Sequence, residues 1–330
     1  MKYYLGIDQG GTKTLVAACG DDGVILGCQE GGASIFYLDD PDNISTRTAY
    51  RLSEDILNST GLTVSDISAV CAGLTGADWD SEYPIHEERT RKGLGISDAI
   101  VLNDCMIALR AGSSEPNRAI ICAGTGLNIA VSTSDGREII YGYYITERMQ
   151  GARALGNSVV DAVVDAEAGV GPVTSLKEIV LEATGYNCFN KFLEHITTRK
   201  YSIHPKHFVI GLLKQAHAGD LAAVKIVNDF AVDLAKYIVA GFSKLHLDDA
   251  DVELVYSGSV FKNVGNIITD RVSKLLSDRF PRLRFKKARY EPVCGALLTL
   301  LDRHYSGAIP DLVMENFDKS CVKYGLLRDM

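Results

Sequence analysis

The stretch Leu5-Gly6-Ile7-Asp8-Gln9-Gly10-Gly11-Thr12-Lys13-Thr14 joins an apolar strand to an aspartate and a double-glycine turn. Two features recur 113 positions later, because Gly11-Thr12 is matched by Gly124-Thr125 and the turn Asp22-Gly23 by Asp135-Gly136. Each copy predicts a strand, a Gly-Thr turn, a strand, an Asp-Gly turn and a strand. The sequence therefore predicts two related lobes, each with a phosphate-sized glycine turn, and a nucleotide held between them.

Length and charge limit the class of protein. The chain has 330 residues, 46% of them hydrophobic, and single cores stop growing at roughly 250 to 300 residues, so we expect two domains. A net charge of −8, with 34 scattered basic and 42 acidic residues, argues against a nucleic-acid surface. No apolar run approaches the ~20 residues of a membrane helix, and the apolar part of MKYYLGID is too short for a signal peptide. We therefore expect a cytoplasmic protein without nucleic-acid or membrane partners.

Hydrophobic patterns in the first lobe favour an α/β fold. They predict a helix at about 43–60, strands at about 68–75 and 99–104, and a helical stretch at 81–92 between these strands. A helix between two such strands is typical of a βαβ unit with a parallel sheet.

The second lobe is expected to begin at about Asn117. Within it, Ser175-x-x-Glu178 predicts a capping box at the start of a helix that Gly185 ends. The basic run from Arg282 to Arg289 alternates with apolar residues, so it predicts a strand with one solvated face.

The first chemical motif is the turn that follows Asp8. Gly10 and Gly11 let the backbone turn sharply, so that N–H groups can face phosphate oxygens, and Thr12 and Lys13 add further donors. Asp8 can hold a hydrated Mg²⁺. The chain has neither GxxxxGK[ST] nor GxGxxG after a strand, so the P-loop and Rossmann interpretations have no support. Taken alone, the turn is also typical of an ordinary Gly-Gly hairpin.

Two later turns follow apolar strands in the second lobe. The first repeats the glycine motif and offers a second set of backbone donors for phosphate. The second leads from a strand into a helix, where open α/β sheets bind ligands. The residues concerned are Gly124, Thr125, Gly126 and Asn128, and then Gly258 and Ser259.

The pair Asn103-Asp104 follows the apolar strand Ala99 to Leu102. An aspartate at this end of a strand could accept the proton of a substrate hydroxyl as that oxygen attacks a γ-phosphate. It could equally be the N-cap of the helix that starts at Cys105. The two roles are compatible in one residue.

Together these motifs resemble the sugar kinase, actin and heat-shock chaperone superfamily, and within it the BadF/BadG/BcrA/BcrD type of ATPases that includes N-acetylglucosamine kinase. The resemblance covers nearly the whole chain, and six motifs in the expected order are far more specific than any one. They are Gly6 to Thr14, Ala72 to Ala77, Asn103-Asp104, Gly124 to Asn128, Ser257 to Ser259, and Pro292 with Gly295-Ala296.

The resemblance implies an α/β fold of two ribonuclease-H-like (actin-like ATPase) domains with an interdomain nucleotide cleft. The first lobe would comprise residues 1–116 and the C-terminal helices at about 301–330, and the second residues 117–300. Gly295 and Ala296, on a helix beginning at Pro292, would permit close packing at the hinge. Homodimers are common among such relatives, so we expect a homodimer.

The resemblance also implies a sugar kinase that uses ATP and Mg²⁺. Asp104 would be the base and Asp8 the metal ligand, with phosphates on the turns at Gly10 to Lys13 and Gly124 to Gly126 and adenosine at Gly258 and Ser259. Thr75, Gly76, Asn103 and Asn128 would lie near the substrate.

The sequence departs from this family where sugar is recognised. N-acetylglucosamine kinases carry an asparagine after an early Gly-x-Ser turn, where this chain reads Gly32-Ala33-Ser34-Ile35-Phe36-Tyr37. Their Gly-Trp-Gly segment and the following acidic pair are replaced here by Gly142-Tyr143-Tyr144 and Met149-Gln150-Gly151-Ala152. Such changes alter the substrate rather than merely loosen it. The single tryptophan, Trp79, is expected to be a partly buried packing residue.

Two other classes of function remain open on sequence. The first is an ATP-driven activator or switch that phosphorylates no small molecule. Activators of the dehydratase type hold an iron-sulfur cluster with cysteines, and the eight cysteines here include no CxxC pair. The second is a sugar-sensing regulator, which the retention of Asp104 and both phosphate motifs disfavours.

Overall fold

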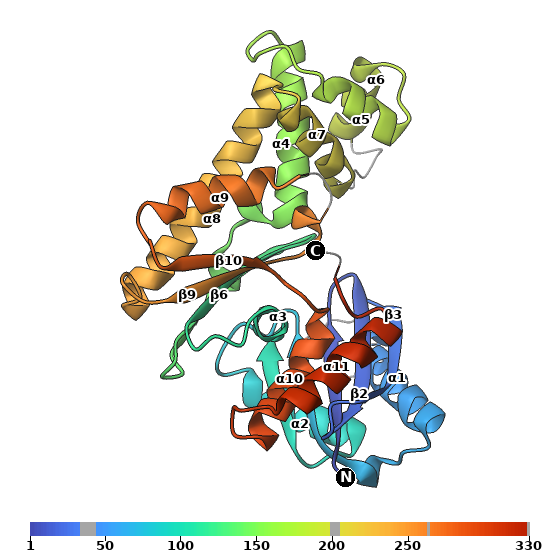
Figure 1. Ribbon diagram of the computed structural model, residues 1–330. Coiled ribbons are helices and arrows are strands. Elements are labelled where there is room, and N and C mark those ends of the chain that lie inside the picture. The colour runs from blue at the N-terminus through green and yellow to red at the C-terminus, as the bar shows by residue number, and fades with distance from the viewer. Residues whose placement is uncertain (34–43, 199–204, 263–264, 329–330) are drawn as a thin grey trace. The chain divides into compact units, whose positions relative to one another are not determined.

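A computed structural model of the chain describes residues 1–33, 44–198, 205–262 and 265–328. Contacts divide the chain into two compact units, Met1–Ile120 with Lys286–Met330 and Ile121–Phe285. Each unit is built on one five-stranded sheet (Figure 1). Within the described ranges, no helix is both long and apolar enough to span a bilayer.

The first sheet has the strand order β3-β2-β1-β4-β5. Its strands are β1 (Tyr3–Gln9), β2 (Lys13–Gly20), β3 (Ile25–Gly32), β4 (Ile67–Leu74) and β5 (Ala99–Asn103). The first three form an antiparallel meander, whereas β4 runs parallel to β1 and β5 parallel to β4. The predicted turn between β2 and β3 is present, with Gly23 in the left-handed region at φ 81°.

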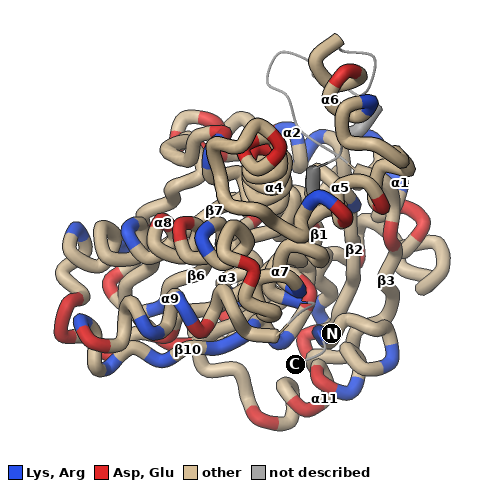
Figure 2. Tube along the Cα trace, turned by 90° about the horizontal axis from the view of Figure 1, so that it is seen from above, with Lys and Arg blue, Asp and Glu red and all other residues tan. Residues whose placement is uncertain are grey.

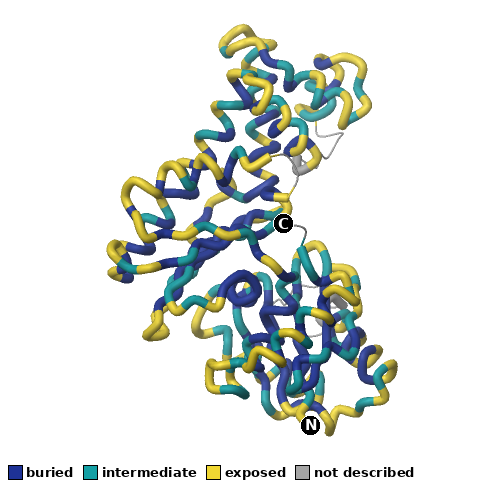
Figure 3. Tube along the Cα trace, in the orientation of Figure 1, coloured by how far each residue is buried: buried dark blue, intermediate teal, exposed yellow. Residues whose placement is uncertain are grey.

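Helices from both ends of the chain cover this sheet. They are α1 (Ile44–Thr60), α2 (Tyr83–Leu94), α3 (Asp104–Gly112), α10 (Pro292–His304) and α11 (Asp311–Lys323), with a short 3₁₀ helix η1 (Val64–Asp66) before β4. Successive strand residues point to opposite faces, so Tyr4 lies in the core with α3, α10 and α11, whereas Leu5 and Ile7 lie in the core with α1. The strands are accordingly buried and the outer helix faces exposed (Figure 3).

The chain returns to the first unit at Lys286, earlier than the expected boundary near residue 300. The cause is α10, which packs on α3 and on the sheet of this unit. A Cβ atom at Gly295 would lie 1.8 Å from the carbonyl oxygen of Ile107 in α3. Only glycine therefore permits α10 to pack so closely on α3. Helix α10 belongs to the core of the first unit and not to the second unit.

The second sheet has the strand order β10-β9-β6-β7-β8, which repeats the order of the first sheet. Its strands are β6 (Arg118–Ala123), β7 (Leu127–Ser132), β8 (Glu138–Ile140), β9 (Val252–Ser257) and β10 (Leu283–Lys287). The sequence repeat thus corresponds to a repeated topology. Burial alternates along β10, which confirms the predicted strand with one solvated face.

The helices of the second unit comprise a block inserted after β8 and two helices that follow it. They are α4 (Gly151–Glu167), α5 (Leu176–Thr184), α6 (Phe189–Thr197), α7 (Val209–His217), α8 (Leu221–Leu245) and α9 (Ile267–Ser277). The described residues of the unit also form the 3₁₀ helices η2 (Gly142–Tyr144), η3 (Glu147–Met149), η4 (Pro205–Phe208) and η5 (Ser259–Phe261). Basic and acidic residues are interspersed along α8 (Figure 2).

Candidate functional site

In the first unit, the carboxyl ends of three parallel strands bring the predicted polar residues together. Asp8 of β1 is paired with Gly73 of β4, and the next residue of β4, Leu74, is paired with Asn103 of β5. Parallel strands end at the same edge of a sheet. Asp8, Thr75 and Asp104 therefore share one edge.

The hydroxyl of Thr75 donates a hydrogen bond to the carboxylate of Asp104. The N–H of Thr75 in turn donates to the carbonyl oxygen of Gln9, at 3.0 Å, so the segment after β4 is fixed to the end of β1. Through these two bonds Thr75 links the carboxylate of Asp104 to the end of β1.

Burial raises the pKa of Asp104 to about 6, helped by the nearby charge of Asp78, while the bonds from Thr75 and from the N–H of Cys105 oppose the rise. Burial also raises the pKa of Asp8 to about 7, and the charges of Asp104 and Glu291 act in the same direction. A carboxylate with a pKa close to the working pH suits proton transfer.

Asn103, not Asp104, is the N-cap of α3. Its side-chain oxygen accepts from the N–H of Cys105 at 3.0 Å, and Asp104 is the first residue of the helix. The side-chain nitrogen of Asn103 donates to the carbonyl oxygen of Ala77 at 3.0 Å and to Asp78 at 2.7 Å. The predicted capping role therefore belongs to Asn103, which also fastens the segment that follows Gly76, a left-handed residue at φ 84°.

The double-glycine turn is closed by a hydrogen bond from the N–H of Gly10 to the carbonyl oxygen of Lys13, at 3.0 Å. Gly11 and Thr12 are exposed, and a Cβ atom at Gly11 would meet no atom within 4 Å. Backbone and hydroxyl groups at the turn are thus open to a ligand.

Lys13, expected as a phosphate donor, is held by carboxylates. Its ammonium lies 3.3 Å from Glu30 and 3.9 Å from Glu291. Glu291 in turn accepts from Arg328 at 3.2 Å, and the two side chains are only 14% and 11% exposed. Arg328 lowers the pKa of Asp8 and so favours its charged form.

Sequence reasoning missed both Glu291 and Arg328. The position of Glu291 directly before Pro292, the first residue of α10, is a signal that could have suggested a residue fixed at a helix start. No local signal marks Arg328.

In the second unit, the repeated glycine turn is fixed by the start of α4. The N–H of Gly124 donates to the carbonyl oxygen of Gly126 at 2.9 Å, and the N–H of Ala152 donates to that of Gly124 at 2.8 Å. A Cβ atom at Gly151 would lie 2.2 Å from the carbonyl oxygen of Gly126. The turn therefore keeps its shape because a glycine helix start packs against it.

The third motif, Gly258 with Ser259, lies against the end of β6. Gly258 has φ 104°, and a Cβ atom there would lie 2.2 Å from the carbonyl oxygen of Ala123. The second unit thus brings Gly258 and Ser259 close to the turn of Gly124 to Gly126. Asn128 lies beyond this turn in β7, where its side-chain oxygen accepts from the N–H of Ile129 at 2.8 Å.

The departures from the sugar-binding pattern lie partly outside the described residues. This holds for Ser34 to Tyr37. In the second unit, Met149 is buried and Gln150 donates to the carbonyl oxygen of Ile145 at 3.1 Å. Trp79 is 53% exposed, so the expectation of a partly buried packing residue is wrong. Trp79 lies in the loop after β4, where its backbone N–H donates to the carboxylate of Glu82 at 3.2 Å.

A family model described as the BadF/BadG/BcrA/BcrD ATPase family matches residues 5–299. The chain is 25% identical to the N-acetylmuramic acid/N-acetylglucosamine kinase of Clostridium acetobutylicum, over 90% of this chain and 98% of that one. It is 25% identical to the N-acetyl-D-glucosamine kinase of Dictyostelium discoideum, over 91% and 98%. A solved structure from Chromobacterium violaceum, described as a candidate N-acetylglucosamine kinase, has a TM-score of 0.68 at 20% identity and covers 91% of this chain and 99% of that one. The predicted family and fold class are confirmed.

Proposed function

This chain belongs to the BadF/BadG/BcrA/BcrD ATPase family, and from that premise we propose that it is an ATP-dependent kinase of a sugar or amino-sugar derivative. The observation that carries the proposal is the strand-end group of Asp8, Thr75 and Asp104, in which Asp104 has a pKa of about 6. Curated relatives that span nearly the full chain are kinases of amino sugars.

Phosphoryl transfer leaves little covalent chemistry to the protein, so positioning and charge stabilisation dominate. Asp104 accepts the proton of the acceptor hydroxyl as that oxygen attacks the γ-phosphorus. Thr75 holds the Asp104 carboxylate in place through its hydroxyl. The turns Gly10 to Lys13 and Gly124 to Gly126 bind phosphates, and Gly258 with Ser259 binds adenosine.

Asp8 fits the role of a Mg²⁺ ligand. Among the described residues, no group of three or more His, Cys, Asp or Glu could hold a metal ion. A site with the carboxylate of Asp8 alone suits Mg²⁺, because this ion is usually bound by one or two carboxylates together with water and substrate phosphates. The neighbouring charges of Asp104 and Glu291, which oppose ionisation of Asp8, are a further reason for a cation there. When bound, the ion would neutralise charge on the phosphates.

The acceptor is a sugar or amino-sugar derivative whose hydroxyl reaches Asp104. Thr75, Gly76, Asn103 and Asn128 belong to its surroundings, and the exposed ring of Trp79 offers an apolar surface beside this edge. Met149 and Gln150 replace the acidic pair of the amino-sugar kinases, so the hydroxyls recognised in the second unit differ from those of N-acetylglucosamine.

The test is Mg²⁺-dependent ADP release by the wild type and Asp104→Asn, with a panel of sugars, amino sugars and muramic acid derivatives. We expect one compound to stimulate release by the wild type and not by the variant. Steady release that no compound stimulates would instead identify an ATPase switch.

Two finer points belong to the same proposal. The protein acts in the cytoplasm, where ATP is available, and it forms a homodimer, as is common among similar kinases. Light scattering at assay concentration tests the homodimer, because a mass of one 35.8 kDa chain would contradict it.

A further inference from the structure

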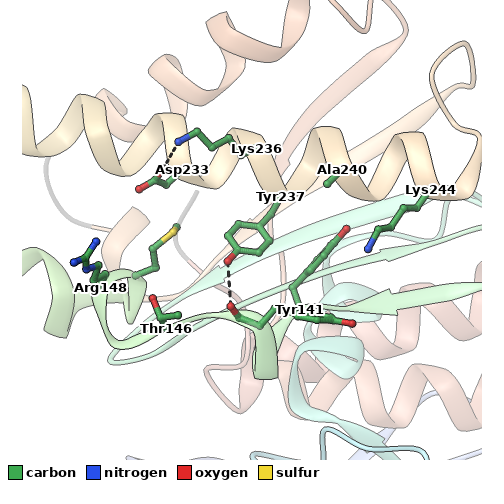
Figure 4. A pocket seen from close by; sticks show the side chains of 10 residues that line it. Tyr141, Thr146, Arg148, Asp233, Lys236, Tyr237, Ala240 and Lys244 are labelled. Carbon is green, nitrogen blue, oxygen red and sulfur yellow. Dashed lines mark hydrogen bonds and ion pairs between the residues drawn. The ribbon is translucent and has the colours of Figure 1, made fainter.

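A pocket of about 580 Å³ lies within the second unit, between α8 and the segment from Tyr141 to Met149 that carries η2 and η3 (Figure 4). Its lining residues lie outside the glycine turns assigned to the nucleotide, whereas Tyr144 and Met149 come from the segments that replace the sugar-binding motifs of the family. Its volume falls in the range of small-molecule sites, which are mostly apolar with a few placed polar groups.

Tyrosine rings form the apolar wall of this pocket. The ring centroids of Tyr141 and Tyr237 lie 5.1 Å apart at 69°, and those of Tyr141 and Tyr144 lie 6.0 Å apart. The hydroxyl of Tyr237 donates to the carbonyl oxygen of Tyr144 at 3.3 Å, which ties the segment to α8. Tyr144 is nevertheless 54% exposed. A flat or cyclic ligand could therefore lie against this wall.

Cations dominate the charge of the pocket. The ammonium of Lys244 stands 5.9 Å from the ring centroid of Tyr141 and 5.8 Å from that of Tyr144. Within the described ranges, no carboxylate forms an ion pair with Lys244 or with Arg148, which lies at the other end of the pocket (Figure 4). The acidic group of the lining, Asp233, is already bound to Lys236 at 2.7 Å. The site therefore favours an anion.

Beneath the pocket wall, the hydroxyl of Tyr141 is buried beside α8. Tyr141 is 3% exposed, and in the part of the chain that is described its hydroxyl oxygen is buried and has no hydrogen-bond partner. A buried polar group without a partner is costly and rare in folded proteins. The oxygen is packed beside α8, 3.5 Å from the position that a Cβ atom at Gly241 would take.

We propose that this pocket is a second ligand site, which binds a small ring-bearing carboxylate or phosphate with its ring against the tyrosines and its acid group at Lys244. The rings supply contact area, and the unpaired ammonium supplies charge. The proposal does not depend on kinase activity, because it concerns binding at residues outside the proposed catalytic group.

The test is calorimetric titration of the full chain with 4-hydroxybenzoate, phenyl phosphate and glucuronate, which separate carboxylate from phosphate and aromatic from sugar rings. We expect saturable binding of at least one anion below about 10 mM, and at least about tenfold weaker binding of the uncharged 4-hydroxybenzamide than of the benzoate. Lys244→Gln should weaken binding of that anion at least about tenfold, since charge-assisted contacts are the strong ones.

The matched control is Lys225→Gln, which removes a lysine of the same helix whose ammonium is bound to Asp229 instead. It should leave the affinity unchanged, as should Asp104→Asn. The proposal is overturned if no anion binds the wild type, if Lys225→Gln weakens binding as much as Lys244→Gln, or if Asp104→Asn abolishes binding. One further outcome overturns the proposal: the wild type is a dimer that binds none of the anions, and Lys244→Gln converts it to a monomer. A second copy of the chain would then cover the pocket.

Discussion

The two sheets share one strand order, yet their strand ends differ in chemistry. The edge of the first sheet carries ionisable side chains, Asp8 and Asp104, with raised pKa values. The edge of the second is built from glycines packed on backbone, with Gly258 against Ala123 and Gly151 against Gly126.

At the displacement of 113 that relates the two glycine turns, Asp8 corresponds to Ile121, which is fully buried. The same place in the topology is a carboxylate in one unit and a core residue in the other. The repeated fold supplies the turns, and the identity of single residues at the strand ends decides which unit carries reactive groups.

The largest expected effect is at the strand ends of the first sheet, which carry Asp8 and Asp104. Asp104→Asn should lower kcat by about 10²- to 10⁴-fold, because general-base catalysis contributes a factor of that size. Nucleotide affinity should stay within about threefold of the wild type, since the glycine turns are untouched. Single-turnover transfer and nucleotide titration measure the two quantities. Asp80→Asn, at an exposed position in the nearby loop, is the matched control, and equal losses in both variants would remove Asp104 from its role.

The next prediction concerns Gly258, at the strand ends of the second sheet. Gly258→Ala should raise the KM for ATP and destabilise the protein by about 1–3 kcal/mol, because it combines φ 104° with a Cβ clash against Ala123. Gly124→Ala meets no atom within 4 Å and should unfold close to the wild type. Denaturant unfolding of both variants makes the comparison, and indistinguishable midpoints would contradict it.

The third effect is a pH dependence of stability, which only the strand ends of the first sheet should contribute, through Asp8. The pKa of Asp8 is raised from 3.8 to about 7, so the folded state binds the proton more tightly than the unfolded state. The stability linked to this group is full below pH 4 and is lost as the pH rises through about 7. Asp8→Asn should therefore raise Tm at pH 8 by a few degrees, relative to the wild type, and by less at pH 4. A Tm difference that does not change with pH would contradict the assigned pKa.

The smallest effect concerns Thr75. Its hydroxyl lowers the pKa of Asp104, so Thr75→Val should move the acid limb of the kcat/KM profile from about 6 to higher pH. The shift should be about one to two pH units, because a hydrogen bond to a charged carboxylate contributes about 1.5–3 kcal/mol. Thr75→Ser keeps the hydroxyl and should restore the wild-type limb. If both variants shift equally, lost packing rather than the hydrogen bond explains the change.

Local patterns predicted the elements that depend on local residues. The paired turns, the strand at β10 and the helix end at Gly185, which has φ 74°, are all present. The capping box at Ser175 is wrong, because the hydroxyl of Ser175 binds Gln215 and Asp220, at 2.8 and 2.9 Å. Asp220 is itself the N-cap of α8. A partner 45 residues away overrode the local signal.

Within the candidate site, the sequence predicted Asp8 and Asp104 but not how their surroundings set their charge. The ion pairs of Lys13 with Glu291 and of Glu291 with Arg328 join the beginning of the chain to its end. No spacing rule reaches across such a separation. Their positions follow from the return of α10, which depends on packing of the whole first core.

The first unit is made from both ends of the chain, with residues of α10 and α11 in the same core as β1 and α3. Ile121–Phe285, in contrast, is one continuous segment. During synthesis on the ribosome, the amino-terminal part of the first unit cannot complete its core until α10 and α11 have emerged. Its apolar face stays uncovered until then. The continuous unit can fold in that interval. A chain terminated after β10 would thus keep every residue of the second unit and still lack the helices that complete the first.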